Sequence, residues 1–216
     1  MEYKKIIKHY ENCFDEHGDC PAGVDWTQAQ QVDTRYNTML DLIRYKEKSF
    51  DINILDTVTL LDYGCGLSHL YEYIINNRIN KINYTGLEIS EKFFNESKKK
   101  FPHNNYILGD LLDTNFNLKS NFDYIVMNGV FTEKRDLNYQ DMFNYFSKMI
   151  LELYKSCNKG IAFNVMSKQV DWEKDFLFHV PLDDIANFLT KNITRNFIIR
   201  NDYGLYEYTV YLYKKK

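Results

Sequence analysis

The stretch that decides the fold is Thr59-Leu-Leu-Asp-Tyr-Gly-Cys-Gly66, and an acidic residue, Glu88, follows 22 positions after Gly66. An apolar run that ends in an acid and two glycines is typical of a buried strand that enters a tight turn before a helix. A second strand that ends in a carboxylate then completes a βαβ unit. Such a unit binds the adenosine part of a cofactor at the ends of its strands.

The spacing of the glycines indicates which cofactor is bound. A dinucleotide site has the pattern G-x-G-x-x-G, in which the third glycine packs against the helix and the pyrophosphate lies at the helix N-terminus. Here Leu67-Ser68-His69 follows Gly66 and contains no third glycine. Asp62, two residues before Gly64, would repel a pyrophosphate, whereas it suits a cationic ligand. S-adenosylmethionine carries a sulfonium and an ammonium group and no phosphate, so the pattern favours it over NAD.

On these residues, and on the order of the segments after them, the chain resembles the class I S-adenosylmethionine-dependent methyltransferases from about Thr59 to its C-terminus. The resemblance implies an α/β fold with a doubly wound, mainly parallel, seven-stranded sheet that ends in an antiparallel hairpin. It also implies S-adenosylmethionine as the cofactor. A dehydrogenase would end in a sixth parallel strand instead, so the two interpretations differ most at the C-terminal edge of the sheet.

Strands and helices alternate after residue 50, and this pattern by itself predicts a parallel sheet covered on both faces. The final pair of strands is predicted to be an antiparallel hairpin, because its connection is too short for a crossover. We expect strands at 58–63, 82–88, 105–108, 122–127, 160–165, 196–200 and 206–213, and helices at 68–77, 90–100, 139–156 and from 182 onward.

Residues 1–50 are predicted to form a helical lid on a cofactor-binding core of residues 51–216. Apolar residues recur at helical spacing between Ile6 and Phe14. Thr27 is expected to cap the next helix, with Gln30 three residues on. A chain of 216 residues suits one domain with a sizeable core, so we expect a single methyltransferase domain.

The composition narrows the class of protein. Hydrophobic residues make up 44% and charged residues 26%, which is ordinary for a soluble globular protein. The net charge of −3 provides no broad attraction to nucleic acid. No apolar run has the length of a signal peptide core or a membrane span, so we expect a cytoplasmic protein without a membrane partner. The cysteine spacing fits no zinc site, and no metal is expected; the oligomeric state is left open.

The residues expected to hold the cofactor follow the first two strands. By resemblance, Gly64 and Gly66 let the backbone approach the methionine part. Asp62 orders the turn or meets the ammonium group through water. Glu88 is expected to accept both ribose hydroxyl groups, with Ile89 beside it.

Further cofactor contacts are expected after the third and fourth strands and from the N-terminal helices. By resemblance, the Asp110 carboxylate accepts the adenine amino group and the backbone N–H of Leu111 meets the ring. Asn128 is expected to face the cofactor. Arg35 is expected to clamp the cofactor's carboxylate or an anionic substrate, and a surface salt bridge explains this residue equally well.

Methyl transfer is an in-line displacement, so the enzyme mainly supplies proximity and alignment. A hydroxyl acceptor benefits from a base, whereas a ready-formed anion does not. His17, in the expected N-terminal loop, and His179, after the fifth strand, are the candidate catalytic bases. His69 is expected to cap or cover the cofactor, and His9 is expected at the surface.

The chain also resembles small bacterial methyltransferases of surface-polysaccharide pathways, including those that add O-methyl phosphoramidate groups to capsules. This resemblance lies in residues 17–18, 23–26, 31, 35–36, 128–131, 167–172 and 202–209. This resemblance implies O-methylation of a small saccharide- or phosphate-containing metabolite, although Asn128 and Thr132 depart from the pattern. The segment Asn128-Gly-Val-Phe131 lacks the two prolines typical of enzymes that methylate nucleic-acid bases or amide nitrogens. Two alternatives stay open: a small-molecule N-methyltransferase, and an inactive cofactor-binding partner of another subunit.

Overall fold

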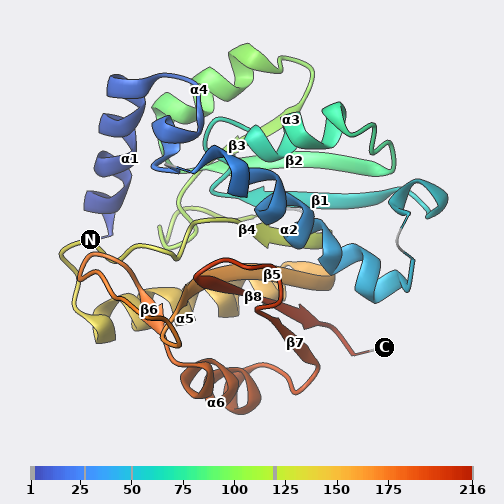
Figure 1. The fold of residues 1–216 in the computed structure, drawn as a ribbon. Coiled ribbons are helices and arrows are strands. Elements are labelled where there is room, and N and C mark those ends of the chain that lie inside the picture. Colours follow the sequence, from blue (N-terminus) through green and yellow to red (C-terminus); the bar gives the residue numbers. More distant parts are fainter. Residues whose placement is uncertain (1–2, 27, 50, 119–120, 216) are drawn as a thin grey trace.

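The computed structural model describes residues 3–26, 28–49, 51–118 and 121–215, so the expected cap Thr27 lies outside the described residues. One sheet is covered by helices on both faces (Figure 1). The strands are β1 (Val58–Tyr63), β2 (Ile82–Glu88), β3 (Asn105–Leu108), β4 (Phe122–Met127), β5 (Cys157–Ser167), β6 (His179–Val180), β7 (Phe197–Arg200) and β8 (Glu207–Tyr213). The α-helices are α1 (Lys4–His17), α2 (Val32–Glu47), α3 (His69–Asn76), α4 (Glu91–Lys100), α5 (Tyr139–Lys155) and α6 (Leu182–Asn192).

The strand order is β3-β2-β1-β4-β5-β8-β7. The first five strands in this order are parallel, whereas β8 runs antiparallel to β5 and β7 antiparallel to β8. This confirms the predicted doubly wound sheet and its antiparallel C-terminal hairpin. The order reverses between β1 and β4, and ligands of open α/β sheets bind at the carboxyl ends of the strands at such a point.

The sheet has an eighth strand, β6, that was not predicted. β5 extends to Ser167 instead of ending at 165, and its pairing with β4 stops at Phe163. Met166 and Ser167 therefore have a free edge, with which the two residues of β6 pair in parallel. A strand of two residues leaves no periodic signal in a sequence, so only the structure reveals it.

The two faces of the sheet form two separate cores, because side chains of a strand alternate between its faces. Leu61 and Ile125 point toward α5 and α6, where Phe146 is fully buried. Leu60 and Val126 point to the other face, where α2 and α3 pack. The alternation fixes the register of the strands and hence the positions of the residues that follow them.

The N-terminal segment does not behave as one unit. α2 packs on the sheet: Leu40, Leu42 and Ile43 have no exposed surface and belong to the same core as β1. By contrast, α1 stands at the edge of the molecule, beside the carboxyl ends of the strands (Figure 1). The part of residues 1–50 that lies over the strand ends is thus α1 with the turn that follows it, and α2 is a covering helix of the sheet.

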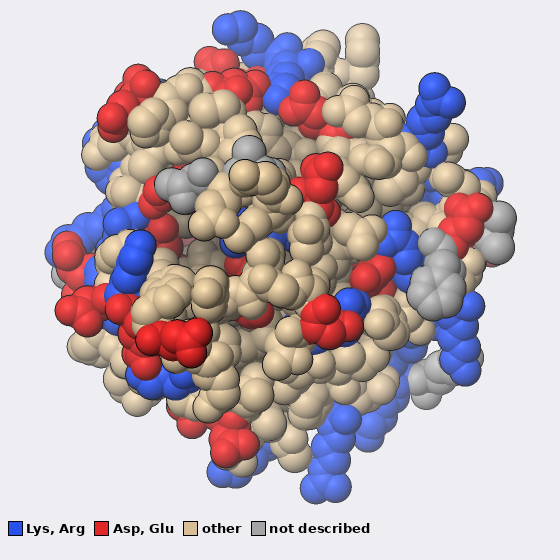
Figure 2. All heavy atoms as spheres, viewed as in Figure 1, with Lys and Arg blue, Asp and Glu red and all other residues tan. Residues whose placement is uncertain are grey.

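The surface carries both signs of charge. On the face shown in Figure 2, acidic and basic side chains are interspersed, and no broad area has a single sign. Within the described residues, no helix combines the length and the apolar character that a membrane span requires.

Candidate active site

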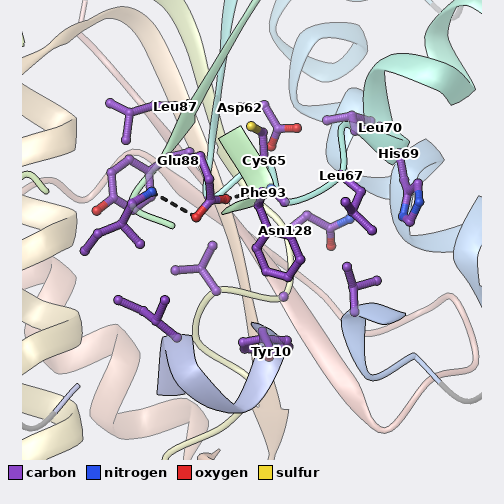
Figure 3. A pocket seen from close by; sticks show the side chains of 18 of the residues that line it. Tyr10, Asp62, Cys65, Leu67, His69, Leu70, Leu87, Glu88, Phe93 and Asn128 are labelled. Carbon is purple, nitrogen blue, oxygen red and sulfur yellow. Dashed lines mark hydrogen bonds between the residues drawn. The ribbon is translucent and has the colours of Figure 1, made fainter. Parts of the chain in front are cut away.

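A pocket opens at the carboxyl ends of β1, β2 and β4, beneath α1. Its empty space of about 1070 Å³ includes a part that is open to solvent. Figure 3 shows Asp62, Glu88 and Asn128 on the side of the strand ends and Tyr10 on the opposite side. We call the strand-end side the floor. The side chains of α1 and of the turn after it form the cover: Tyr3, Ile6, Ile7, Tyr10, Val24 and Trp26.

The glycine turn forms part of the floor. Gly64 and Gly66 adopt φ values of 71° and 53°, in the left-handed region that side chains disfavour. A Cβ atom on Gly64 would lie 2.7 Å from Cγ2 of Val130. Glycine is therefore required at position 64 both by its backbone conformation and by the close approach of the loop after β4.

Glu88 fastens this turn to β2. Its Oε2 accepts from the N–H of Gly66 at 2.8 Å, and its Oε1 accepts from the N–H groups of Ile89 and Ser90 at 2.9 Å each. Burial raises the pKa of the Glu88 carboxyl group, and the three N–H donors partly oppose that shift. A carboxylate oxygen has about two accepting positions. Oε1 is thus fully used and Oε2 retains room for one ligand hydroxyl, whereas the sequence suggested that Glu88 accepts two.

Asp62 is a buried carboxyl group at the back of the floor. Its side chain is 3% exposed, and Oδ2 accepts from the Tyr84 hydroxyl at 2.8 Å. Burial, with a smaller contribution from the charge of Glu88, raises the pKa of Asp62 to about 7. A cation placed beside such a group is strongly favoured, because it restores the charged form that burial penalises.

Asn128 presents its side-chain amide to the same space. Both polar atoms of the amide are buried, and neither has a hydrogen-bond partner among the described residues. A buried amide without partners costs free energy, and native structures rarely contain one. Since Asn128 lines the pocket, a polar ligand is its natural partner, and the floor fits a cofactor with polar groups.

Three residues expected in the cofactor site do not line the pocket. Asp110 accepts from the Tyr3 hydroxyl at 2.6 Å and from the backbone N–H of Leu112 at 3.0 Å, so Tyr3 lies between it and the pocket. Leu111 is half-buried and packs against the core. Arg35 forms an ion pair with Glu207, with 3.0 Å between Nε and Oε2, which corresponds to the salt-bridge alternative but is largely buried.

Neither histidine proposed as a base lines the pocket. His17 lies in the last turn of α1 instead of a loop, and its side chain is half-exposed. His179 is buried in β6, where Nδ1 donates to the carbonyl of Ser167 at 2.7 Å and Nε2 accepts from the N–H of Lys174 at 3.4 Å. Both nitrogens of His179 are therefore bonded to the backbone. For this reason, and because His17 lies outside the pocket lining, the geometry argues against both residues as the base.

His69 does line the pocket, from the first turn of α3. Its Nε2 lies 2.7 Å from Oδ1 of Asp19, which also pairs with Lys100 at 2.9 Å. The sequence assigned His69 only a capping or covering role. Its position directly after the glycine turn could have indicated a pocket residue, but the sequence does not reveal its carboxylate partner 50 residues away.

Charged residues whose contacts were not predicted from the sequence attach the cover to the loop after β4. His9, expected at the surface, lies 2.8 Å from Asp25, and the Arg135 guanidinium contacts Asp25 at 2.6 Å and Glu133 at 2.5 Å. Burial raises the pKa of Glu133 to about 8. His9, Cys13 and Asp25 lie close enough to share a metal ion. Because the Arg135 guanidinium already contacts both Asp25 and Glu133, however, the arrangement is that of a polar cluster that ties α1 to the loop after β4.

Comparison with known proteins agrees with the fold. Residues 61–160 match a family model described as a methyltransferase domain. A protein of Mycobacterium tuberculosis (strain ATCC 25618 / H37Rv), named "Putative methyltransferase Rv1506c", is 23% identical over 168 residues, which cover 76% of this chain and 97% of that protein.

Solved methyltransferase structures share the fold over nearly the whole chain. Magnesium protoporphyrin IX methyltransferase (ChlM) from Synechocystis PCC 6803 with bound SAM is 18% identical, with a TM-score of 0.62 over 98% of this chain and 97% of that one. The plantazolicin methyltransferase BpumL, in complex with a pentazolic desmethylPZN analog and SAH, is 14% identical, with a TM-score of 0.61 over 100% of this chain and 91% of that one.

The sheet with its C-terminal hairpin, the glycine turn and the matching domain define the class, a Rossmann-like class I methyltransferase. The protein is an S-adenosylmethionine-dependent methyltransferase, and S-adenosylmethionine is its cofactor.

Proposed function

We propose that this enzyme methylates a hydroxyl group of a small saccharide- or phosphate-containing metabolite in the cytoplasm, in a pathway of surface-polysaccharide biosynthesis. S-adenosylmethionine supplies the activated methyl group. The chain holds the cofactor, orients the acceptor hydroxyl and removes its proton. The polysaccharide pathway rests on the sequence resemblance, whereas the hydroxyl acceptor is supported by the pocket.

We assign the floor to the cofactor. The glycine turn and Asp62 bind the methionine part. Burial raises the pKa of Asp62 to about 7, and the ammonium group of the cofactor favours the ionised carboxylate. Glu88, through the free position on Oε2, binds one ribose hydroxyl, with Ile89 beside the nucleoside. Asn128 forms hydrogen bonds with the same cofactor through its unpaired side-chain amide. Asp110 and Leu111 remain the proposed adenine contacts, because each carboxylate oxygen of Asp110 keeps one accepting position beside its present donor.

The observation that carries the hydroxyl acceptor is the pair formed by His69 and Asp19 at the pocket. An imidazole oriented by a carboxylate is a suitable general base for a hydroxyl group. Trp26, Tyr36 and Tyr10 line the same pocket and offer ring faces to the apolar face of a sugar. The same rings favour a second candidate, the methylation of a small amine, since aromatic faces attract cations.

The test is a measurement of S-adenosylhomocysteine formation with sugar phosphates, nucleotide sugars and small amines as acceptors. His69→Gln should lower kcat at least about 100-fold, because general-base catalysis contributes that much, while the Kd for S-adenosylhomocysteine stays within about threefold. The matched control is His103→Gln, at an exposed position outside the pocket lining. Turnover with amines alone, or full activity of His69→Gln, would reject the hydroxyl acceptor and its base.

A further inference from the structure

A chain of hydrogen bonds connects α2, through β8 and β5, with the loop after β4. The backbone N–H of Gly129 donates to Oδ1 of Asn164 at 2.8 Å. Nδ2 of Asn164 donates to Oε1 of Glu207 at 3.0 Å. Oε2 of Glu207 accepts from Nε of Arg35 at 3.0 Å. We call the side chains of Arg35, Asn164 and Glu207 the polar relay.

The polar relay is almost entirely removed from solvent. Asn164 is 0% and Glu207 3% exposed, and the Arg35 side chain is 15% exposed. Because buried polar groups are costly unless they are paired, each bond restricts where its partners can lie. The strand geometry explains the first bond. β4 makes its last pairing at Met127 with Phe163, so the N–H of Gly129 has no strand partner, and the next residue on β5, Asn164, accepts from it instead.

Gly129 is also held from its other side. Gly129 has a φ of 80°, and a Cβ atom there would lie 3.2 Å from Cζ2 of Trp26. The Arg35 guanidinium lies over the same indole ring, with its Cζ 5.1 Å from the ring centroid. Arg35 thus supports both restraints on Gly129, because it pairs with Glu207, which accepts from Asn164, and it packs on Trp26.

The neighbours of Gly129 are the residues that face the ligand. Asn128 holds its unpaired amide in the pocket, and Val130 packs against Gly64 of the glycine turn. A shift of Gly129 would therefore move Asn128 and loosen the contact between the two loops.

We propose that the polar relay positions the loop 128–130 against the glycine turn for methyl transfer. Arg35, Asn164 and Glu207 are positioning residues that act through Gly129 and do not contact the cofactor. The proposal rests on the assignment of Asn128 to the cofactor under the proposed function. It replaces the expectation that Arg35 clamps a carboxylate of the cofactor or of the substrate, because the guanidinium is committed to Glu207 and Trp26.

The test uses Asn164→Leu, a variant of similar volume that neither accepts from Gly129 nor donates to Glu207. We expect its Kd for S-adenosylhomocysteine to rise about tenfold by calorimetry, which is the effect of about one hydrogen bond. In the ligand-free protein, we expect the Gly129 amide proton to exchange faster by NMR. Glu207→Gln keeps one oxygen for Asn164 but loses the charge that pairs with Arg35, so its Kd for S-adenosylhomocysteine should rise by less than that of Asn164→Leu.

The matched control is Glu47→Gln. Glu47 is a half-buried carboxylate outside the pocket lining that accepts from Lys159 at 3.1 Å and from Tyr124 at 2.7 Å. This variant should lower the unfolding midpoint without changing the Kd. A folded Asn164→Leu with unchanged Kd and unchanged Gly129 exchange would overturn the proposal.

The wild-type protein gives a second test that needs no variant. The Gly129 amide should exchange far more slowly than that of Gly204, which lies at an exposed position. Equal exchange rates would overturn the polar relay even if every variant failed to fold. If the wild-type protein fails to bind S-adenosylhomocysteine, the cofactor assignment is contradicted instead. The exchange rate of the Gly129 amide tests the polar relay separately, so failure of the relay and failure of the cofactor assignment can be told apart.

Discussion

The floor and the cover of the pocket are built in different ways. The floor consists of strand ends whose positions are fixed by parallel pairing, such as Asp62 with Gly86 and Tyr63 with Leu87. Its acids are buried and bonded to the backbone or to a buried phenol. The cover, in contrast, is attached by separate side-chain contacts, including Tyr3 with Asp110 and Glu11 with Ser90.

This difference predicts how the two sides respond to change. A hydrogen bond or partly exposed ion pair of the cover contributes about 1 kcal/mol or less. The floor shares the stability of the whole sheet. Changes to the floor should therefore affect both folding and binding strongly, whereas changes to the cover should act mainly on how fast ligand enters and leaves.

The largest effect is expected for Glu88→Ala, which breaks the floor. The variant leaves three buried N–H groups without their acceptor and removes the proposed ribose contact. The free energy of unfolding should fall by about 2–4 kcal/mol, and the Kd for S-adenosylhomocysteine should rise at least about 100-fold. Urea unfolding and calorimetry measure the two. Glu91→Ala, exposed at the start of α4, is the control; equal effects of the two variants would contradict the special position of Glu88.

The next effect is expected for Gly64→Ala, with Gly204→Ala as its matched control. Both glycines have nearly the same φ, 71° and 73°, but only at Gly64 does a Cβ atom meet another group, Val130 at 2.7 Å. Both variants should lose about 1–2 kcal/mol of stability through backbone strain. Only Gly64→Ala should lose a further 1–3 kcal/mol, an order-of-magnitude cost of overpacking, and weaken S-adenosylhomocysteine binding tens of fold. Equal binding by the two variants would show that the glycine turn does not shape the site.

The same contrast explains what the sequence predicted. The floor follows from local rules: an apolar run, two glycines and an acid define Asp62, Gly64, Gly66 and Glu88, and the structure places all four at the pocket. The cover and the polar relay join residues far apart in the chain, such as Arg35 and Glu207, 172 positions apart. No periodic pattern specifies such a pair. The bond of His179 to the carbonyl of Ser167 escapes the sequence for the same reason, since it lies across the unpredicted pairing of β5 with β6.

A smaller effect is expected in how the free energy of unfolding depends on pH, through Asp62 in the floor. Burial raises the pKa of Asp62 from an ordinary value of 3.8 to about 7, so between these values the folded state binds a proton that the unfolded state does not. The free energy of unfolding should therefore fall as pH rises through this window and level off above it. The titratable groups that interact with Asp62 include Tyr84, Glu88, Cys65 and Tyr36.

Ligand binding should show the opposite slope. The ammonium group of S-adenosylhomocysteine favours ionised Asp62, so below about pH 7 its affinity should rise with pH by up to about tenfold per unit, with release of a proton. Calorimetry in two buffers of different ionisation enthalpy counts that proton. Asp62→Asn should make both slopes shallower, and the slope of stability that remains comes from Glu88 and Glu133, whose pKa values burial also raises. If the variant keeps the wild-type slopes, another group is responsible.

The smallest effect is expected in the cover, for Tyr3→Phe. The ring still stacks on Tyr145, with 4.7 Å between centroids, and only the hydrogen bond to Asp110 is lost. Stability should fall by about 1 kcal/mol, and S-adenosylhomocysteine should dissociate about three- to fivefold faster in stopped flow, because the start of α1 is less firmly held. Tyr139→Phe removes a similar bond, from a phenol to Asp184 at 2.7 Å, outside the pocket lining, and should leave the dissociation rate unchanged. Slower dissociation and tighter binding by Tyr3→Phe would reverse the interpretation, because the Tyr3 hydroxyl would then compete with the nucleoside for Asp110 instead of holding the cover over it.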